Sequence, residues 1–333
     1  MPEKHAPTNS NIVTIGGGSG QHALLSALRE IEAIDITAVV SMVDSGGSTG
    51  RLRDELGILP PGDILKCVLA LSPHHEFARQ ILQKRFQKDR RLAGHNAGNM
   101  LLTMLTRYTG NFPAGVAALS EILDARGTIL PVTVDQATLV AELTDGTRIC
   151  GEQAIDIPRS HQRQKIHDIF LVPHHASAIQ VYPPVVTAIA KADYILIGPG
   201  DLFTSIIPNL IVPGVSEALQ NAKAPLLYLL NIMTKFGETH NFKVMDFVAR
   251  LEASIGKPID GIIGNTKRPV DAVCKRYEAH QAEYVAFDPD DPGWAHRTIH
   301  ADDLIDTDGN IVRHHPQKLA RLLRTLFTQG KNP

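Results

Sequence analysis

Glycine and serine gather at residues 16–20, where the sequence reads GGGSG. The apolar run NIVTI comes directly before them, and the helical pattern QHALLSALREI comes directly after. Glycine lets the backbone approach a phosphate closely, and the first turn of a helix offers unpaired N–H groups. The segment therefore predicts an anion-binding turn, formed by Gly17, Gly18, Ser19 and Gly20.

This turn fits neither of the two common phosphate-binding patterns. Gln21 stands where the dinucleotide-binding pattern GxGxxG needs its third glycine. No Lys-Ser or Lys-Thr pair follows the turn, as a P-loop would require. An ordinary structural turn between a strand and a helix remains the alternative.

A second glycine turn, DSGGSTGRLRDELG, follows the β-branched run ITAVVSMV. Asp44 occupies the end of the predicted strand, where an acidic side chain often meets a ribose. Gly46, Gly47 and Ser48 add a second flexible backbone rich in N–H groups. The two arginines that follow either face an anion or form solvated pairs with the acidic residues beside them.

Further polar residues close strand-like runs or open helical patterns. AGHNAGNML reads as an exposed helix start, and LPPGDILKC offers Asp63 as a helix N-cap or as a contact to a metal or phosphate. ILIGPGDLFTS, LLNIMTKF and IIGNTKRP each end a buried run with small or polar residues. The candidate ligand contacts in these segments are His95, Asn96, Asn99, Gly198, Gly200, Thr204, Ser205, Asn231, Thr234 and Asn265.

Apolar strands that alternate with helical patterns predict which elements hold these residues. We expect an α/β fold, a Rossmann-like and mostly parallel sheet with helices on both faces. Residues 11–325 are predicted to form a single domain after a disordered leader at 1–10. Alternating residues and an Asp-Gly turn predict a small β-rich insertion around 128–158. Because ligands bind at the carboxyl ends of parallel strands, the polar turns would share one edge.

Composition excludes several classes of protein. The chain has 333 residues, 43% hydrophobic and 20% charged, with a net charge of −2. This balance gives no electrostatic reason to expect nucleic acid or a membrane surface as partner. No apolar run reaches the about 18 residues that a membrane span needs. The 3 cysteines are far apart, which argues against a disulfide framework and favours a cytoplasmic location.

Taken together, these motifs resemble the CofD-like superfamily. The resemblance extends over about residues 11–315 and is carried, in order, by GGGSGQHALLSALR, VDSGGSTGRLRDELGILPPGD, GHNAGNMLL, ILIGPGDLFTSIIPNLIVPGV and NIMTKFGETHNF. It is strongest to the YvcK branch, the gluconeogenesis factors. The other branch is 2-phospho-L-lactate transferase, which acts in the synthesis of a deazaflavin coenzyme.

The resemblance implies a nucleotide-derived ligand over the glycine turns. For the YvcK branch it implies UDP-sugars such as UDP-N-acetylglucosamine, with Tyr277 and Arg313 in the pocket. For the transferase branch it implies a guanylated lactyl donor, a deazaflavin acceptor and Mg²⁺, for which Asp44 or Asp63 is the candidate ligand. As residue types alone, Tyr277 could stack on a base and Arg313 could bind a diphosphate. The alternative is a core aromatic and a surface arginine.

The sequence departs from the family pattern near the predicted ligand. Ser45 replaces a second aspartate, which removes one carboxylate that could hold Mg²⁺. Leu65 and Lys66 replace an Arg-Asn pair, and Asp201 replaces a serine. These changes leave the identity of the ligand and any role of a metal open.

Two functions follow as hypotheses. The first is a regulator that binds a nucleotide-sugar and acts on a partner enzyme, linked to cell-wall precursor supply, cell shape and gluconeogenic growth. The second is an Mg²⁺-dependent transferase, because phosphoryl-type transfer needs mainly positioning and charge neutralisation. Whether the protein is an enzyme stays open; if it is one, it transfers phosphorus-containing groups. The resemblance alone also implies a homodimer.

Overall fold

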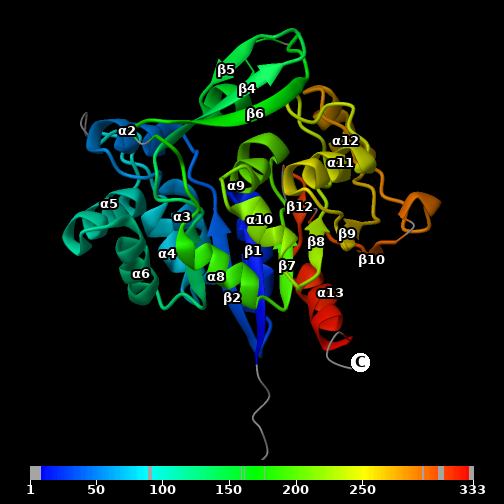
Figure 1. The fold of residues 1–333 in the computed structure, drawn as a ribbon, viewed down its shortest axis with the longest axis horizontal. Helices are drawn as coiled ribbons and strands as arrows, with labels where there is room; N and C mark the ends of the chain where they lie inside the picture. Colours follow the sequence, from blue (N-terminus) through cyan, green and yellow to red (C-terminus); the bar gives the residue numbers. More distant parts are fainter. Residues whose placement is uncertain are drawn as a thin grey trace, which may run out of the picture.

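The computed structural model describes residues 9–88, 92–158, 160, 162–175, 177–294, 296–306 and 311–329. Its centre is a seven-stranded sheet with the order β10-β9-β8-β7-β1-β2-β3 (Figure 1). Every pairing in this sheet is parallel. The strands are β1 (Ser10–Gly16), β2 (Ile34–Val40), β3 (Thr128–Pro131), β7 (Tyr194–Ile197), β8 (Leu226–Leu229), β9 (Gly261–Asn265) and β10 (Thr298–Asp302).

Helices cover both faces of the sheet, which confirms the predicted Rossmann-like fold. The strand order runs one way from β1 to β3 and the other way from β7 to β10, so right-handed crossovers place their helices on opposite faces. In Figure 1, α8 (Pro183–Lys191) and α10 (Val215–Gln220) lie in front of the sheet. The remaining helices are α1 (Gly18–Arg29), α2 (Gly47–Leu56), α3 (Gly62–Leu71), α4 (His75–Leu82), α5 (Ala97–Thr109), α6 (Phe112–Ile122), α7 (Glu152–Asp156), η1 (Leu202–Ile206), α9 (Ile207–Leu210), α11 (Val244–Ile255), α12 (Asp271–Glu278), η2 (Pro292–Trp294) and α13 (Pro316–Gln329).

The register of the central strands brings the polar turns to one level. Gly16 at the end of β1 pairs with Val40 at the end of β2, and Ile15 pairs with Ile197 at the end of β7. The strand order reverses between β1 and β7, and such a switch point is where open α/β sheets leave a crevice for ligands. The turns after β1 and β7 therefore flank the predicted binding edge.

A small antiparallel sheet lies above the carboxyl ends of the main strands in Figure 1. Its order is β5-β4-β6, with β4 (Ala137–Leu143), β5 (Arg148–Cys150) and β6 (Ile166–Pro173). α7 lies in the chain between β5 and β6, and we call residues 137–173 the insertion. The prediction of 128–158 started too early and ended too soon, because β3 pairs with β2 in the main sheet and β6 completes the small one.

The other predicted boundaries differ by a few residues. Of the predicted leader, residues 1–8 lie outside the described residues, and Ser10 already begins β1. At the other end, α13 continues past residue 325 to Gln329. A two-stranded sheet of β11 (Ile305–Asp306) and β12 (Arg313–His314) precedes α13. Within the described residues, no helix is both long and apolar enough to cross a membrane.

Candidate functional site

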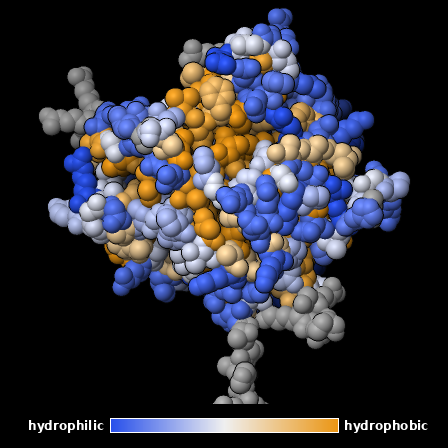
Figure 2. Space-filling view, viewed as in Figure 1, coloured by the Kyte–Doolittle hydropathy of each residue, from blue (hydrophilic) through white to orange (hydrophobic). Residues whose placement is uncertain are grey.

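A cavity of about 890 Å³ opens at the carboxyl edge of the main sheet. Its walls come from the turns after β1, β2, β7 and β8, from α7 of the insertion, and from α12 and β12 near the end of the chain. In the view of Figure 2, hydrophobic residues gather on the face below the small sheet. The cavity joins segments that lie nearly 300 residues apart, Gly17 and Arg313 among them.

The first glycine turn borders the cavity and is shaped by close backbone contacts. Gly17 is the N-cap of α1 and provides no side-chain cap, so the first N–H groups of the helix are left to other partners. Gly18 has a positive φ of 63°, which favours glycine. A Cβ on Gly20 would lie 2.2 Å from the carbonyl oxygen of Pro199 in the turn after β7. Glycine at position 20 thus lets the two turns touch.

Gln21 has a structural role that the glycine patterns do not anticipate. Its side-chain amide donates to Thr14 Oγ1 at 3.2 Å and to the carbonyl oxygen of Val39 at 3.0 Å. The residue is fully buried and links β1, β2 and α1 behind the turn. A glycine at position 21 would lose both hydrogen bonds.

Asp63 lies beside the glycine turn rather than at a helix N-cap. Pro61 is the N-cap of α3, so the prediction of Asp63 as N-cap was wrong. Asp63 Oδ2 accepts a 2.7 Å hydrogen bond from the N–H of Gly18, and Oδ1 accepts a 2.8 Å bond from Lys66 Nζ. Both carboxylate oxygens are thereby occupied. Asp63 therefore positions the glycine turn.

Asp44 and Glu152 place two further carboxyl groups in the cavity wall. Asp44 Oδ1 accepts a 2.9 Å hydrogen bond from the N–H of Gly46. Burial and the nearby charge of Asp63 raise the pKa of Asp44. Burial, with the charges of Asp44 and Asp156, raises the pKa of Glu152 to about 8. Carboxyl groups with raised pKa values in a cavity are typical of functional sites.

The second glycine turn packs away from the cavity. Gly46 is the N-cap of α2, Gly47 begins this helix, and Ser48 is buried. Ser48 Oγ lies 2.9 Å from His95 Nδ1 and accepts a 3.3 Å hydrogen bond from Asn99 Nδ2.

The predicted exposed helix start at α5 is buried instead, because this network holds α2 against α5. His95 is 4% exposed and Asn99 is 2% exposed. Asn96 caps α5 by accepting a 2.7 Å hydrogen bond from the N–H of Asn99. Of the arginines of the second turn, Arg53 pairs with Asp54 at 2.8 Å, as the solvated alternative predicted.

The turns after β7 and β8 are tied together at the cavity. Asn231 donates to the carbonyl oxygen of Gly200 at 2.7 Å and accepts from its N–H at 3.2 Å. Thr204 donates to Glu238 Oε1 at 3.0 Å, and Glu238 also accepts from the N–H of Phe203 at 2.9 Å. Glu238 thus occupies the start of η1, where a ligand phosphate was expected to meet Thr204. Ser205, the next residue, borders the cavity.

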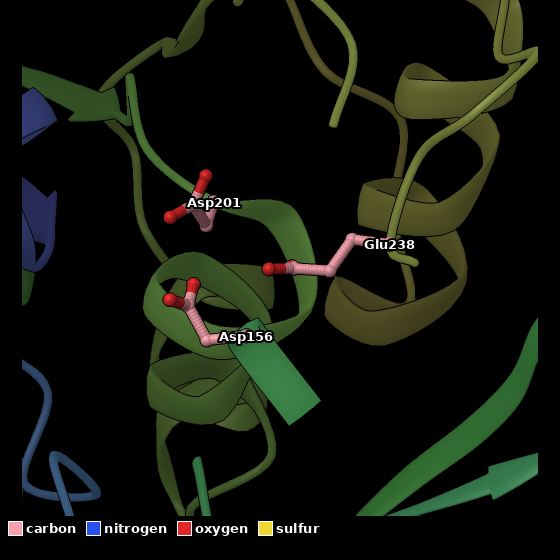
Figure 3. A group of neighbouring side chains, drawn as sticks. All are labelled: Asp156, Asp201 and Glu238. Atoms are coloured by element: carbon pink, nitrogen blue, oxygen red, sulfur yellow. The ribbon is translucent and has the colours of Figure 1, made fainter. Parts of the chain in front are cut away.

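Asp156, Asp201 and Glu238 turn their carboxyl groups toward one another (Figure 3). Their oxygens lie within 4.8 Å of one another, the spacing of a possible metal site. Lys235 already occupies the middle of this group: its ammonium bonds Asp156 and lies 2.8 Å from Asp201 and 3.4 Å from Glu238. Burial acts to lower the pKa of Lys235, but the three carboxylates raise it. The lysine therefore supplies the charge that a metal ion would supply.

Tyr277 and Arg313 both line the cavity. The Tyr277 hydroxyl accepts a 2.8 Å hydrogen bond from the N–H of Val312, which links α12 to the strand that carries Arg313. Arg313 is exposed at the cavity. Burial, with the charges of Arg79 and Arg313, lowers the pKa of His22 in α1 to about 4. The strand β12, which begins with Arg313, also packs against α1, the helix that the first glycine turn opens.

The cavity brings together twelve of the twenty predicted ligand contacts. They are Gly17, Gly18, Ser19, Gly20, Asp44, Gly200, Thr204, Ser205, Asn231, Thr234, Tyr277 and Arg313. Eight others do not border it, namely Gly46, Gly47, Ser48, His95, Asn96, Asn99, Gly198 and Asn265. Asn265, for example, is buried and bonds the backbone of Lys267 and Leu304.

Several residues of the cavity wall were missed by sequence reasoning. They are Ser41, Lys66, Glu152, Asp156, Lys235 and His314. Lys235 directly follows the predicted Thr234, so the same turn could have pointed to it. Glu152 and Asp156 had no such signal, because they reach the cavity only through the folding of the insertion.

Comparisons with known proteins agree with this architecture. A family model described as 2-phospho-L-lactate transferase CofD matches residues 12–305. A gluconeogenesis factor of Bacillus subtilis is 37% identical over 319 residues, covering 96% of this chain and 98% of the relative. A gluconeogenesis factor of Listeria monocytogenes is 34% identical over 326 residues, covering 98% of each.

A crystal structure of a protein from Bacillus halodurans is also similar. It matches with a TM-score of 0.87 and 35% sequence identity, covering 95% of this chain and 99% of the other. The similarity in sequence and in fold therefore extends over nearly the whole length of this chain. The chain belongs to the CofD family and, within it, to the gluconeogenesis factors.

Proposed function

We propose that the protein binds a nucleotide-sugar of the UDP-N-acetylglucosamine type in the 890 Å³ cavity. The observation that carries this proposal is the meeting of the first glycine turn with Tyr277 and Arg313 in one cavity. The cavity volume lies in the usual range of about 300–1,000 Å³ for small-molecule sites. A nucleotide-sugar needs N–H groups for its phosphates, a cation for their charge and a flat apolar surface for its base, and these residues offer all three.

Each contact has a physical basis. The N-terminus of α1 favours negative charge. The N–H of Gly18 is bonded to Asp63, so the N–H groups that follow it are the ones proposed to meet a diphosphate. The guanidinium of Arg313 can form two parallel hydrogen bonds to phosphate oxygens. The ring of Tyr277 offers a flat apolar surface for a base, while its hydroxyl stays bonded to Val312. If Mg²⁺ accompanies the diphosphate, Asp44 is its proposed protein ligand.

We further propose that binding regulates a partner enzyme. Two observations support a sensor: Lys66 is paired with Asp63, and Lys235 is paired with Asp156 and Asp201. These lysines are already paired with carboxylates in the free protein, and we propose that the cavity binds its ligand without reacting with it. The relatives named gluconeogenesis factors support a link to gluconeogenic growth, and we extend the proposal to cell-wall precursor supply and cell shape. A homodimer is a further proposal, which sedimentation can test.

A transferase is the second candidate. It is favoured by the raised pKa values of Asp44 and Glu152 in the cavity wall and by the transferase description of the family. Such an enzyme would act on a nucleotide-activated donor with Mg²⁺. Incubation with guanylated phospholactate, a deazaflavin acceptor and Mg²⁺ tests this reaction, and absence of product at high protein concentration counts against it.

Calorimetry tests the binding proposal directly. The wild type is titrated with UDP-N-acetylglucosamine, GDP and NAD, and we expect heat of binding that is strongest for the uridine ligand. Arg313→Ala should weaken that affinity by about ten-fold or more, since one charged hydrogen-bonding partner of the diphosphate is lost. Arg148→Ala, an exposed arginine of the insertion that pairs with Glu142, is the matched control. Absence of uridine-sugar binding, or equal affinity in Arg313→Ala, would contradict the proposal.

A further inference from the structure

Helix α7 of the insertion forms part of the cavity wall, and hydrogen bonds to other segments hold it at both ends. Ser45, in the turn after β2, accepts a 3.0 Å hydrogen bond from the N–H of Gln153 and donates its own N–H to Glu152. At the other end, Asp156 bonds Lys235 in the segment after β8. The hydroxyl of Ser45 thus caps a helix from a distant part of the chain. These bonds hold α7, and with it Glu152, in a defined position.

Among the described residues of the cavity wall, Glu152 and Asp44 are carboxyl groups without a lysine salt bridge, unlike three others. Asp63, Asp156 and Asp201 each pair with a lysine. For Glu152, within the ranges that the structure describes, the partner is a single N–H group, at 3.3 Å from Oε2. The carboxyl group borders the cavity and retains hydrogen-bonding capacity toward it.

A second unsatisfied group borders the same cavity. Ser41, at the end of β2, is 2% exposed, and its hydroxyl has no hydrogen-bond partner among the described residues. Buried polar groups in native proteins are normally paired, so an unpaired hydroxyl in a cavity wall indicates a ligand or water partner. Ser41 lies against the first glycine turn, because a Cβ on Gly17 would be 3.5 Å from the Cβ of Ser41.

The order of the strands fixes the order in which the proposed binding residues follow one another along the cavity. α12 with Tyr277 follows β9, the first glycine turn follows β1, and Ser45 with its partner Glu152 follows β2. Four strand spacings separate β9 from β2, which is roughly 19 Å at about 4.8 Å each. A ligand with its base at Tyr277 and its diphosphate at the glycine turn would therefore carry its next group toward Glu152.

We infer that Glu152 lines the subsite for the hydroxyl-bearing group attached to the diphosphate and sets the specificity for this group, while Ser41 lies at the glycine turn beside the diphosphate. The inference rests on the proposed function, since it assumes a nucleotide-diphosphate ligand. Hydroxyl and amide groups of a hexose both donate and accept hydrogen bonds, and the protonated carboxyl group of Glu152 offers an O–H donor as well as acceptor capacity toward them. A nucleoside diphosphate without the sugar makes no such contact.

Calorimetry with a pair of ligands tests this assignment. The wild type, Glu152→Ala and Glu152→Gln are each titrated with UDP-N-acetylglucosamine and with UDP. We expect Glu152→Ala to bind the sugar nucleotide about ten-fold more weakly than the wild type and to bind UDP within about two-fold of it. Glu152→Gln keeps an acceptor oxygen at the same place, so it should recover part of the loss. Glu142→Ala, also in the insertion but paired with Arg148 away from the cavity, is the matched control.

Three outcomes would decide against the inference, and they are distinguishable. Equal losses of affinity for both ligands in Glu152→Ala would mean that the residue positions α7 and does not contact the sugar. Unchanged affinity for both ligands would place the sugar elsewhere while the proposed function stands. A wild type that binds neither ligand would overturn the proposed function, and this inference with it. Unchanged UDP affinity in Glu152→Ala also shows that the variant is folded.

Discussion

Asp63 accepts a 2.7 Å hydrogen bond from the backbone N–H of Gly18, so the helix start of α3 holds the glycine turn of α1. The same carboxylate binds Lys66 at 2.8 Å. The turn is thus shaped before any ligand arrives, because one buried acid satisfies a backbone donor and a cation together. A preformed turn costs less conformational entropy on binding than a mobile one.

Removal of the Asp63 carboxylate should destabilise the protein and the glycine turn. We expect Asp63→Ala to lower the free energy of unfolding by about 2 kcal/mol, since a hydrogen bond and an ion pair are lost at a buried site. Asp63→Asn should lower the free energy of unfolding by less, because an acceptor oxygen remains. Urea denaturation measures the change. Asp54→Asn, at the exposed pair with Arg53, should change stability by less than about 0.5 kcal/mol.

The contact between the two turns requires glycine at position 20. A methyl group there would lie 2.2 Å from the Pro199 carbonyl oxygen, and backbone on both sides would have to shift. We expect Gly20→Ala to destabilise by about 2 kcal/mol and to weaken nucleotide binding, as overpacking does. Gly200→Ala is the control, since its methyl would meet no atom closer than 3.4 Å. Equal stability of both variants, in urea denaturation, would show that the turns do not touch.

The protonation of Glu152 makes stability depend on pH. Its pKa is raised from 4.5 to about 8 in the folded protein, so between these values the folded state holds a proton that the unfolded state has lost. This contribution to stability is complete below pH 4.5 and is lost as pH rises through 8. Glu152→Gln removes the contribution. We expect its melting temperature to fall less than that of the wild type between pH 5 and about pH 9; parallel curves would contradict the raised pKa.

The hydrogen bond between Tyr277 and Val312 should position Arg313 for binding. Tyr277→Phe keeps the ring and removes the acceptor, so we expect nucleotide affinity to fall about five-fold through a looser Arg313 segment. The double variant with Arg313→Ala should then lose less than the two single losses predict, by about 1 kcal/mol. Calorimetry on the four proteins measures this coupling. Additive losses would mean that Tyr277 acts on the ligand independently.

Replacement of Lys235 should expose a latent cation site. Lys235→Met leaves Asp156, Asp201 and Glu238 without their central cation, and we expect it to destabilise by about 2 kcal/mol. Three carboxylates within 4.8 Å suit a divalent cation, so Mn²⁺ should raise the melting temperature of the variant more than that of the wild type. Lys235→Arg keeps the charge and should show no added response.

The sheet and its turns could be predicted because their signals are local. Buried strands such as Ile12–Ile15 are continuous apolar runs, and the glycines of the first turn stand directly at the start of a helix. The parallel order of these elements then places their turns on one edge. The family motifs, read from the same residues, extended the prediction to Tyr277 and Arg313, which the structure does place in the cavity wall.

The composition of the site depended on contacts between distant residues. Ser48 and His95 are plausible ligand contacts by sequence, yet they bind each other, 47 residues apart, because α2 packs on α5. Glu152 and Asp156 lie in a short helix with no motif, and only the folding of the insertion over the edge brings them to the cavity. The sequence alone determined the strands, the helices and the glycine turns between them, since each depends on neighbours along the chain. The tertiary structure decided which polar groups border the cavity and which are already satisfied within the protein, because a hydrogen bond is formed by whichever partner the packing brings near.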